Sequence, residues 1–327
     1  MRAPAFWSRR GLASSLLLPA ALLWDLGGWL RWRLVRPERL PIPVVCVGNL
    51  TAGGAGKTPT VLALAALLKE RGLAVHALSR GYGGCEAGPL RVDPARHEAA
   101  AVGDEPLLLA RACPTWVARD RAAGARAAVA GGAEVLLLDD GLQNPALHKD
   151  LVLAVVDAAV GFGNGRVMPA GPLRENLARG LGRADALLAI GHGEALPPGL
   201  AATGKPLLRA DLRPEDPGAW RGRRLLAFAG IGRPAKFFET LRGLGAELAG
   251  TRAFADHHAY GAAEAEALLA EAAGLGAELV TTEKDRLRLP PRLAESTRVL
   301  PVHLGWRDKR GIEDLLDRIL ADGRAQP

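Results

Sequence analysis

The chain has 327 residues, which is enough for two α/β lobes of ordinary size that each have a hydrophobic core. Its 49% hydrophobic and 24% charged residues are typical of a globular protein and exclude a disordered or fibrous chain. The formal net charge is +7, but residues 1–40 hold seven arginines and two acidic residues, so the remainder is nearly neutral. This distribution argues against a polynucleotide-binding face. Three widely spaced cysteines indicate neither a disulfide framework nor a zinc site.

Residues 1–33 are predicted to anchor the chain to a membrane. The apolar run 16–24 has arginines on both sides, four tryptophans in and around it, and Asp25 as the single charged residue between the arginines. Tryptophan and arginine beside an apolar run are typical of a membrane surface. Pro19 and the Gly27-Gly28 pair favour shallow insertion over a full span. A buried core helix and a cleaved signal peptide are the alternatives, although no A-x-A site follows the run.

A phosphate-binding loop is predicted next. Residues 43–48 form a short apolar strand, residues 57–70 have apolar side chains at helical spacing, and a glycine-rich stretch joins them. Glycines let backbone N–H groups close around phosphate oxygens, and the N-terminus of the helix adds positive potential. The predicted ATP-binding residues are Thr51, Ala52, Gly53, Gly54, Ala55, Gly56, Lys57 and Thr58.

Two side chains of this loop have predicted chemical roles. Lys57 is expected to contact the β- and γ-phosphates, and the hydroxyl of Thr58 is expected to bind Mg²⁺. The strict G-x-x-x-x-G-K-[ST] pattern has glycine at the position of Thr51, so the match is incomplete. A glycine-rich turn that binds no nucleotide is the competing interpretation.

An apolar strand ends in two carboxylates further along the chain. Residues 134–140 read EVLLLDD, as expected for a parallel strand that is buried on both faces. Ligands of open α/β sheets bind beyond the carboxyl ends of the strands. Asp139 and Asp140 are therefore predicted to lie near Thr58 and the metal ion. An ordinary strand end with an Asp-Gly turn is the alternative.

A second acidic pair precedes the apolar stretch 107–110. On the residues alone, Asp104 fits a helix N-cap, and Glu105 in the first turn favours the helix dipole. A catalytic carboxylate is the other interpretation of Asp104, and the two roles are compatible.

In this order, the motifs resemble those of the bacterial lipid A 4′-kinase (tetraacyldisaccharide 4′-kinase) family. The resemblance extends from the loop almost to the C-terminus, and it includes an apolar N-terminal segment. The matching segments are GNLTAGGAGKTPT (48–60), SRGYGG (79–84), VGDEP (102–106), LLLDDGLQN (136–144), FGNGRVMPAGPLRE (162–175), FADHH (254–258) and TTEKD (281–285).

The resemblance implies an ATP- and Mg²⁺-dependent kinase. It implies transfer of the γ-phosphoryl group to the 4′-hydroxyl of tetraacyldisaccharide 1-phosphate, which gives lipid IVA, at the cytoplasmic face of the bacterial inner membrane. The implied partners are this glucosamine disaccharide lipid and the membrane surface. Neither nucleic acid nor an obligate protein partner is expected.

The resemblance also implies roles for single residues. Asp104 takes the position of the acid that activates the sugar hydroxyl, and His257 takes that of a histidine supporting it. Asp139 takes a Mg²⁺-linked position. Further motif positions near the site are occupied by Glu105, Asp140 and Gln143.

The chain departs from the family pattern at one motif. The pattern commonly continues DDGFQH, whereas residues 139–144 read DDGLQN. The side chain of Asn144 does not exchange a proton near neutral pH, which argues against proton transfer at this position. His258 and His148 are candidates to compensate.

The remaining pattern predicts two lobes that follow the membrane-associated helix. A P-loop NTPase-like parallel-sheet lobe is expected over 34–212, a linker over 213–223, and a second, smaller α/β lobe over 224–327. The expected strands of these regions are 151–156, 185–190, 206–211, 246–251, 277–281 and 298–303, and the expected helices are 233–243, 262–274 and 311–321. Because His257 falls in the second lobe, closure of the lobes would complete the site.

Two other functions stay open at this point. A P-loop nucleotide switch or metallochaperone GTPase is the leading alternative, but in residues 282–285 the lysine is one position out of register with the guanine-selecting [NT]-K-x-D pattern. A non-enzymatic membrane adaptor would leave the loop and the carboxylates unexplained.

Overall fold

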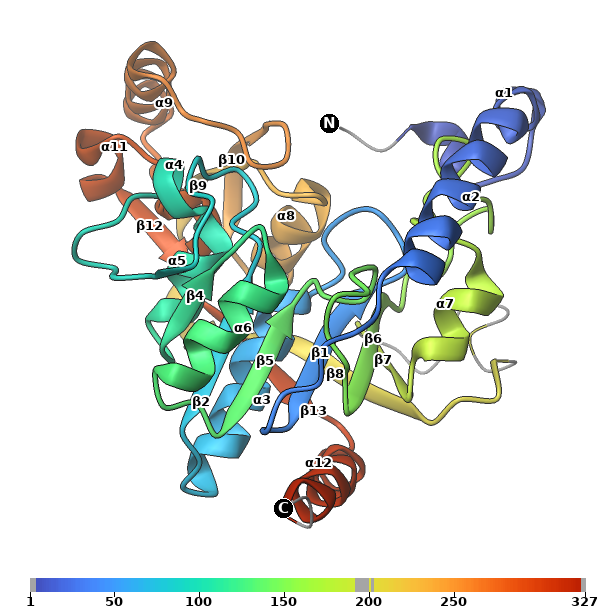
Figure 1. Ribbon diagram of the computed structural model, residues 1–327. Helices are drawn as coiled ribbons and strands as arrows, with labels where there is room; N and C mark the ends of the chain where they lie inside the picture. The colour runs from blue at the N-terminus through green and yellow to red at the C-terminus, as the bar shows by residue number, and fades with distance from the viewer. Residues whose placement is uncertain (1–3, 192–199, 201–202, 325–327) are drawn as a thin grey trace.

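The structure is a computed structural model that describes residues 4–191, 200 and 203–324. Within these residues, two sheets form a large and a small lobe (Figure 1). The large sheet has the order β13-β8-β7-β6-β1-β5-β2-β4-β3, and the small sheet has the order β10-β9-β11-β12. The strands from β8 to β4 are parallel, and β13 and β3 pair antiparallel at the two edges. The predicted α/β architecture with two lobes is confirmed.

The strands of the large sheet in chain order are β1 (Val44–Asn49), β2 (Val75–Ser79), β3 (Leu90–Arg91), β4 (Thr115–Val117), β5 (Val135–Asp139), β6 (Leu151–Asp157), β7 (Ala186–Ile190), β8 (Leu207–Pro214) and β13 (Val302–Trp306). Those of the small sheet are β9 (Arg224–Ala229), β10 (Glu247–Ala253), β11 (Glu278–Thr282) and β12 (Thr297–Leu300). The α-helices are α1 (Leu12–Leu16), α2 (Leu18–Leu34), α3 (Lys57–Glu70), α4 (Ala99–Val102), α5 (Asp104–Ala110), α6 (Arg121–Ala130), α7 (Leu177–Arg183), α8 (Pro234–Gly243), α9 (Ala262–Leu275), α10 (Glu283–Arg286), α11 (Pro291–Glu295) and α12 (Lys309–Arg324).

Helices cover both faces of the large sheet. The central strands β1, β5 and β6 are buried along their whole length, as their continuous apolar sequences predict. Leu64 and Leu68 of α3 belong to the core on one face, and Ala125 and Ala128 of α6 belong to the core on the other. This doubly wound arrangement leaves the carboxyl ends of the strands free for a ligand site.

The small lobe repeats this plan with fewer elements. Its four described strands are parallel. Phe237 and Phe238 of α8 pack on one face, and Leu268 and Ala272 of α9 pack on the other. The helix predicted over 233–243 and the one predicted over 262–274 are thus confirmed within one residue.

The C-terminal boundary predicted for the second lobe is wrong. The expected strand 298–303 is two strands separated by Pro301: β12 belongs to the small sheet, and β13 pairs antiparallel with β8 of the large sheet. Helix α12 follows β13 and buries Ile312 and Leu316 in the core that α3 also covers. An amphipathic helix must cover an apolar surface, and here the large sheet provides it. The predicted linker also begins too early, because β8 continues to Pro214.

Helices α1 and α2 lie along one side of the large lobe (Figure 1). In these two helices, which the structure describes throughout, the buried residues are Ser14 and Ala21. The interpretation of this segment as a buried core helix is therefore wrong. None of the described helices is long and apolar enough to cross a membrane.

Candidate active site

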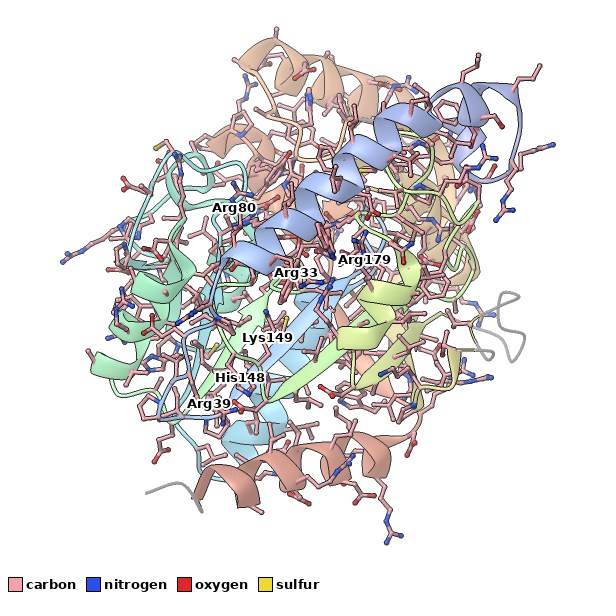
Figure 2. All side chains as sticks on the ribbon, turned by 45° about the vertical axis from the view of Figure 1, so that its right-hand side comes forward. Arg33, Arg39, Arg80, His148, Lys149 and Arg179 are labelled. Carbon is pink, nitrogen blue, oxygen red and sulfur yellow. The ribbon has the colours of Figure 1, made fainter. Side chains whose placement is uncertain are left out.

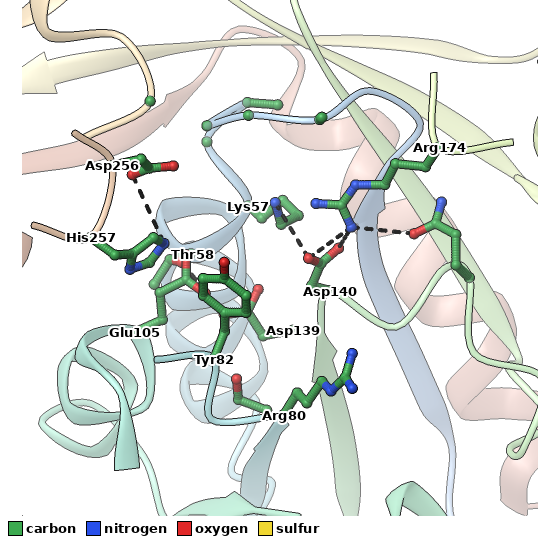
Figure 3. Close-up of a pocket in the computed structure, with 18 of the residues that line it drawn as sticks. Lys57, Thr58, Arg80, Tyr82, Glu105, Asp139, Asp140, Arg174, Asp256 and His257 are labelled. Carbon is green, nitrogen blue, oxygen red and sulfur yellow. Dashed lines mark hydrogen bonds and ion pairs between the residues drawn. The ribbon is translucent and has the colours of Figure 1, made fainter. Parts of the chain in front are cut away.

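A cavity of about 1630 Å³ lies where the small lobe faces the carboxyl ends of β1 and β5 (Figure 3). Its lining includes the loop after β1, the first residues of α3, Asp139 and Asp140 at the carboxyl end of β5, and residues 231–233 and 256–257 of the small lobe. It also extends to α2 of the N-terminal segment. One cavity therefore connects the predicted nucleotide loop with the predicted membrane-facing helix.

The glycine-rich loop has the backbone that its sequence predicts. Gly53 and Gly56 have φ values of +114° and +94°, a region that favours glycine. A Cβ atom at Gly56 would also lie 2.7 Å from the terminal methyl of Ile190, so a side chain there would displace Ile190. The amide of Asn49 donates to the carbonyl of Gly53 at 3.1 Å. This loop brings the buried residues Lys57 and Thr58 to the start of α3.

The carboxylates of Asp139, the last residue of β5, and of Asp140, which follows it, contact different residues at the start of α3. The hydroxyl of Thr58 donates to Asp139 at 3.4 Å. Asp140 lies 3.8 Å from the ammonium of Lys57 and accepts two hydrogen bonds of 2.9 Å from Arg174 (Figure 3). Asp140 has a φ of +58°, an uncommon backbone conformation for a residue with a side chain that is often found at functional sites.

The surroundings of Asp139 fit a magnesium ion. Its Oδ1 atom is buried and has no hydrogen-bond partner, and the Thr58 hydroxyl lies beside its other oxygen. Burial, then the charges of Glu105 and Asp140, raises the pKa of Asp139 to about 7. A bound cation would give the Oδ1 atom a partner and would oppose the rise in the pKa of Asp139. Mg²⁺ is usually bound by one or two carboxylates together with phosphate and water, and Asp139 provides one such carboxylate.

Asp104 lies directly behind the wall of the cavity that Glu105 and His257 form, and it is held by residues of the small lobe. Its side chain is buried, 3.1 Å from Nδ1 of His257 and 3.2 Å from the guanidinium of Arg288. Burial opposes its charge, but the hydrogen bond to His257 and the charges of Lys284, His257 and Arg288 outweigh burial, so the pKa of Asp104 lies below its ordinary value. Gly103 is the N-cap of α5, and Asp104 is the first helical residue. The carboxylate is thus ionised and positioned by both lobes.

A second ion pair joins the lobes beside the first. The ammonium of Lys284 lies 2.6 Å from Glu105. Burial opposes both charges, yet their mutual attraction lowers the pKa of Glu105 and raises that of Lys284. His257 itself has a φ of +57°, fixed by a hydrogen bond from its backbone N–H to the carbonyl of Gly230. Residues on two segments of the small lobe, the loop with His257 and residues 284–288, therefore converge on the Asp104–Glu105 turn.

Comparison with known proteins decides the family. The sequence model of the tetraacyldisaccharide-1-P 4′-kinase family, LpxK, matches residues 13–321. The chain belongs to this family. Tetraacyldisaccharide 4′-kinases of Rhodospirillum centenum and a Methylobacterium species are 56% and 59% identical, over 98% and 93% of this chain and 96% and 93% of their own lengths. The structure of LpxK from Aquifex aeolicus in complex with ATP is 29% identical, has a TM-score of 0.74, and covers 94% of this chain and 99% of its own.

Membership of the tetraacyldisaccharide 4′-kinase family confirms the resemblance seen in the sequence, and it favours a kinase over the nucleotide-switch alternative. All the residues proposed from the motifs of this family lie in or directly beside the cavity. Gln143, for example, donates to the carbonyl of Asn49 and to Glu175, both at 3.0 Å, and accepts from Arg174 at 3.4 Å.

The departure from the pattern of this kinase family is structurally local. Leu142 is buried in the core, and Asn144 accepts a hydrogen bond of 2.8 Å from the backbone of Ala146. His258 stacks on Phe254 and bonds to Glu264, and His148 contacts Arg39 and Asp150. Neither histidine lines the cavity, so neither replaces a proton-transfer group at position 144.

Sequence reasoning gave no role to three charged residues of the site. Arg174, Lys284 and Arg288 each bind one of the acidic side chains. A signal existed for two of them, because Arg174 belongs to the matching segment 162–175 and Lys284 to the segment 281–285. Arg288 lies outside every matched segment, and only the contact across the lobes identifies it.

Proposed function

We propose that this protein transfers the γ-phosphoryl group of ATP to the 4′-hydroxyl of tetraacyldisaccharide 1-phosphate, a step of lipid A biosynthesis. The observation that carries this proposal is the ionised, buried Asp104, which lies 3.1 Å from His257, a residue that lines the same cavity as the phosphate loop. A carboxylate in that place can accept the proton of an attacking hydroxyl. The complex of Aquifex aeolicus LpxK with ATP supports ATP as the phosphoryl donor.

The reaction needs one bond to form and one to break. The sugar hydroxyl oxygen bonds to the γ-phosphorus, and the bond from that phosphorus to the β–γ bridging oxygen breaks, with its electron pair left on ADP. Asp104 takes the hydroxyl proton, and His257 orients Asp104 and shares its charge. Lys57 and the loop amides of residues 53–58 hold the phosphates in place. Phosphoryl transfer depends mainly on such positioning and charge stabilisation.

Magnesium is the proposed metal. Thr58 and Asp139 would hold it, since the hydroxyl and the unpaired Oδ1 atom are the oxygen ligands that this ion prefers. When bound, it would neutralise charge on the phosphates. Asp140 is engaged by Lys57 and Arg174, so we assign it to the support of these cations.

Attachment to the inner membrane is proposed for α1 and α2. Their large apolar side chains form an exposed series beside the cavity, as expected for helices that bind in the interface of a bilayer. The exposed large apolar residues of this series are Leu12, Leu16, Leu18, Leu22, Leu23, Trp24, Leu26, Trp29, Leu30 and Leu34. The cytoplasmic face is the proposed side, because ATP is available there.

Basic side chains next to this apolar series favour an anionic lipid. Arg33, Lys149 and Arg179 lie together beside α2 (Figure 2). The guanidinium of Arg183 is 4.3 Å from the ring centre of Trp32, and the ammonium of Lys149 is 5.1 Å from it. Because arginines 33, 179 and 183 also line the cavity, a phosphorylated lipid with its acyl chains on α2 would meet positive charge.

A direct assay tests the proposed function. Purified protein is incubated with Mg²⁺, γ-labelled ATP and the disaccharide 1-phosphate in detergent micelles, and lipid-bound label and free phosphate are measured. We expect label on the lipid only when the disaccharide is present. The Lys57→Ala variant, prepared in parallel, detects any contaminating kinase. Phosphate release that is independent of the disaccharide, with no labelled lipid, would contradict the proposal in favour of a hydrolysing switch.

A further inference from the structure

We infer that Arg233 and Lys236 of the small lobe bind the terminal phosphate of the nucleotide held in the loop 51–58. This inference rests on the proposed function, because it assigns a role at the same cavity. It concerns residues that neither the motifs nor the Asp104 cluster includes. The ligand is defined by its chemistry as the γ-phosphate of a nucleoside triphosphate.

The start of α8 lies directly against the phosphate loop. A Cβ atom at Gly232 would lie 2.8 Å from the backbone nitrogen of Gly54, which is one of the loop amides expected to close around phosphate. Gly232 and Gly54 therefore touch across the two lobes. Arg233 follows this contact, Lys236 lies in the first turn of α8, and both line the cavity together with Lys57. These two side chains are the small lobe's positive charges closest in sequence to the contact with the loop.

Arg233 and Lys236 both face the same carboxylate oxygen of Asp157. Arg233 forms an ion pair with Oδ2 of Asp157, and Lys236 lies 3.8 Å from the same oxygen. The other oxygen of Asp157 accepts a hydrogen bond of 2.9 Å from the backbone of Ala159. Two cations thus share one carboxylate oxygen, and a single carboxylate neutralises only one of them. An anionic ligand would balance the second charge.

The position of Asp157 shows how Arg233 and Lys236 could leave this carboxylate and bind a phosphate in the loop. Asp157 ends β6, which pairs with β1 on the side opposite to β5. The phosphate loop therefore emerges between Asp157 on one side and Asp139 on the other. Asp157 is 11% exposed, whereas the side chains of Arg233 and Lys236 are 37% and 31% exposed and retain freedom to turn toward the loop.

This placement gives the two cations a function in the transfer step. As the bond between the γ-phosphorus and the bridging oxygen breaks, negative charge increases on the transferred group and on ADP. A positive side chain supplied by a second element is an established way to stabilise that charge. Because Arg233 and Lys236 belong to the small lobe, they would act only when the lobes are closed over the loop.

Nucleotide binding provides the first test. Calorimetry with Mg²⁺ compares the affinity for a non-hydrolysable ATP analogue, adenylyl imidodiphosphate, with that for ADP. We expect Arg233→Ala to lower the preference for the triphosphate about tenfold, in line with the loss of one charged contact to the γ-phosphate. Arg242→Ala, at the exposed C-terminal end of the same helix, is the matched control. An unchanged preference in Arg233→Ala and in the Arg233→Ala/Lys236→Ala double variant would overturn the inference.

Lipid phosphorylation provides the second test and separates phosphate binding from a purely structural ion pair. We expect kcat to fall about 10–10²-fold in Arg233→Ala and further in the double variant, because an arginine in this role contributes up to about 10³–10⁵-fold in other P-loop enzymes. Asp157→Asn breaks the ion pair but keeps both cations, so it should lower kcat less. If Asp157→Asn were as harmful as Arg233→Ala, and the combined variant no worse than either, the pair would serve only to hold the lobes together.

The two tests also distinguish this inference from the proposed function. If the wild-type protein does not phosphorylate the disaccharide, the proposed function fails, while the calorimetric preference still reports on Arg233. Thermal unfolding of each variant shows whether a loss reflects misfolding, and Arg233→Lys, which keeps the charge, should restore part of the triphosphate preference.

Discussion

In the nucleotide half of the cavity, the carboxylates of Asp139 and Asp140 contact residues of the large lobe, whereas in the acceptor half the carboxylates of residues 104 and 105 contact residues of the small lobe. Lys57, Thr58, Asp139, Asp140 and Arg174 all belong to the large lobe and contact one another there. On the acceptor side, the large lobe supplies the carboxylates and the small lobe supplies their partners.

This difference has a consequence for catalysis. The small lobe touches the phosphate loop through Gly232 and Gly54, but it has a larger part in the acceptor half, where the charge of the proposed base depends on it. Asp104 is buried, and burial alone would raise its pKa. The small lobe's His257, Lys284 and Arg288 reverse that direction. The contacts from the small lobe therefore keep the pKa of the proposed base low, and a loss of these contacts would raise it.

The largest expected effect is on the acceptor half. Asp104→Asn keeps the shape of the side chain but removes its ability to accept a proton, so kcat should fall by about 10²–10⁴-fold. The affinity for ATP should change little, because the nucleotide half is separate. Steady-state kinetics and calorimetry on the same preparation measure both quantities. Retained kcat with a lowered melting temperature would show that Asp104 only stabilises the start of α5.

The corresponding change in the nucleotide half is Lys57→Ala. It removes a positive charge at the β- and γ-phosphates, and kcat/KM should fall by about 10²–10³-fold, as for other groups that stabilise transition-state charge. In contrast to Asp104→Asn, this variant should also bind ATP more weakly. Near-normal kcat/KM in a folded Lys57→Ala protein would contradict the assignment of the loop.

The metal site gives a third comparison. Asp139→Asn should raise the Mg²⁺ concentration for half-maximal activity roughly 10–100-fold, a loss typical even of residues that only support metal ligands. Thr58→Ala should act in the same direction, and Thr58→Ser, which retains the hydroxyl, should have the smaller effect. The measurement is a magnesium titration of the initial rate at saturating ATP. An unchanged magnesium requirement in both Asp139→Asn and Thr58→Ala would exclude them as ligands.

Arg288 tests the dependence of the base on the small lobe. Arg288→Ala removes a cation 3.2 Å from Asp104, so burial is opposed less and the pKa of Asp104 should rise. The base must be ionised, and the acidic limb of the kcat/KM profile should therefore move to higher pH. We expect about a tenfold loss at neutral pH, which is smaller than the roughly 10²–10⁴-fold loss expected when a positioned base is removed.

Two controls accompany this experiment. Arg288→Lys keeps the positive charge and should leave the acidic limb closer to that of the wild type. Arg292→Ala removes an exposed arginine of the same lobe. Its ion-pair partner is Glu266 and not Asp104, so the acidic limb should not move. A loss of activity in Arg288→Ala without any shift of the limb would mean that Arg288 acts through Asp285 and the fold alone.

The smallest expected effect on chemistry concerns the membrane-facing helices. The paired substitution Leu22→Ser and Leu23→Ser removes two exposed leucines and should weaken vesicle binding by roughly tenfold or more, since each buried leucine contributes about 1.5–3 kcal/mol. Activity on the disaccharide in detergent should be nearly unchanged. Flotation with anionic vesicles measures binding, and Val160→Ser, at another exposed apolar residue, is the control. Equal flotation of the paired variant and the wild type would place the attachment elsewhere.

Substitution is a sharper test here than deletion of the N-terminal segment. The indole of Trp24 donates to the carbonyl of Arg174 at 3.0 Å, and Asp25 accepts from the backbone of Asn176 at 2.9 Å and pairs with Arg179. Removing α2 would thus disturb the same segment that supports Asp140. The side chains of Leu22 and Leu23 are exposed and form no hydrogen bond or ion pair, so their substitution leaves this segment in place.

The sequence by itself determined the nucleotide half and most of the elements. The loop, α3 and the strand that ends in Asp139 are encoded by local patterns: glycine spacing, helical periodicity and a continuous apolar run. Helix α3 covers the residues that its periodicity predicts, from Lys57 to Glu70. These features depend on neighbours in the chain, so a linear pattern contains the necessary information.

Only the tertiary structure decided the C-terminal boundary, the contact of Arg288 with Asp104 and the exposure of the N-terminal helices. The strand pattern at 298–303 is compatible with either sheet, and pairing with β8 selects the large one for β13. Arg288 contacts Asp104 across 184 positions of the chain, counted from 104 to 288, and belongs to no matched segment. An apolar helix is buried or exposed according to the surface that meets it, and no local pattern specifies a contact between segments this far apart.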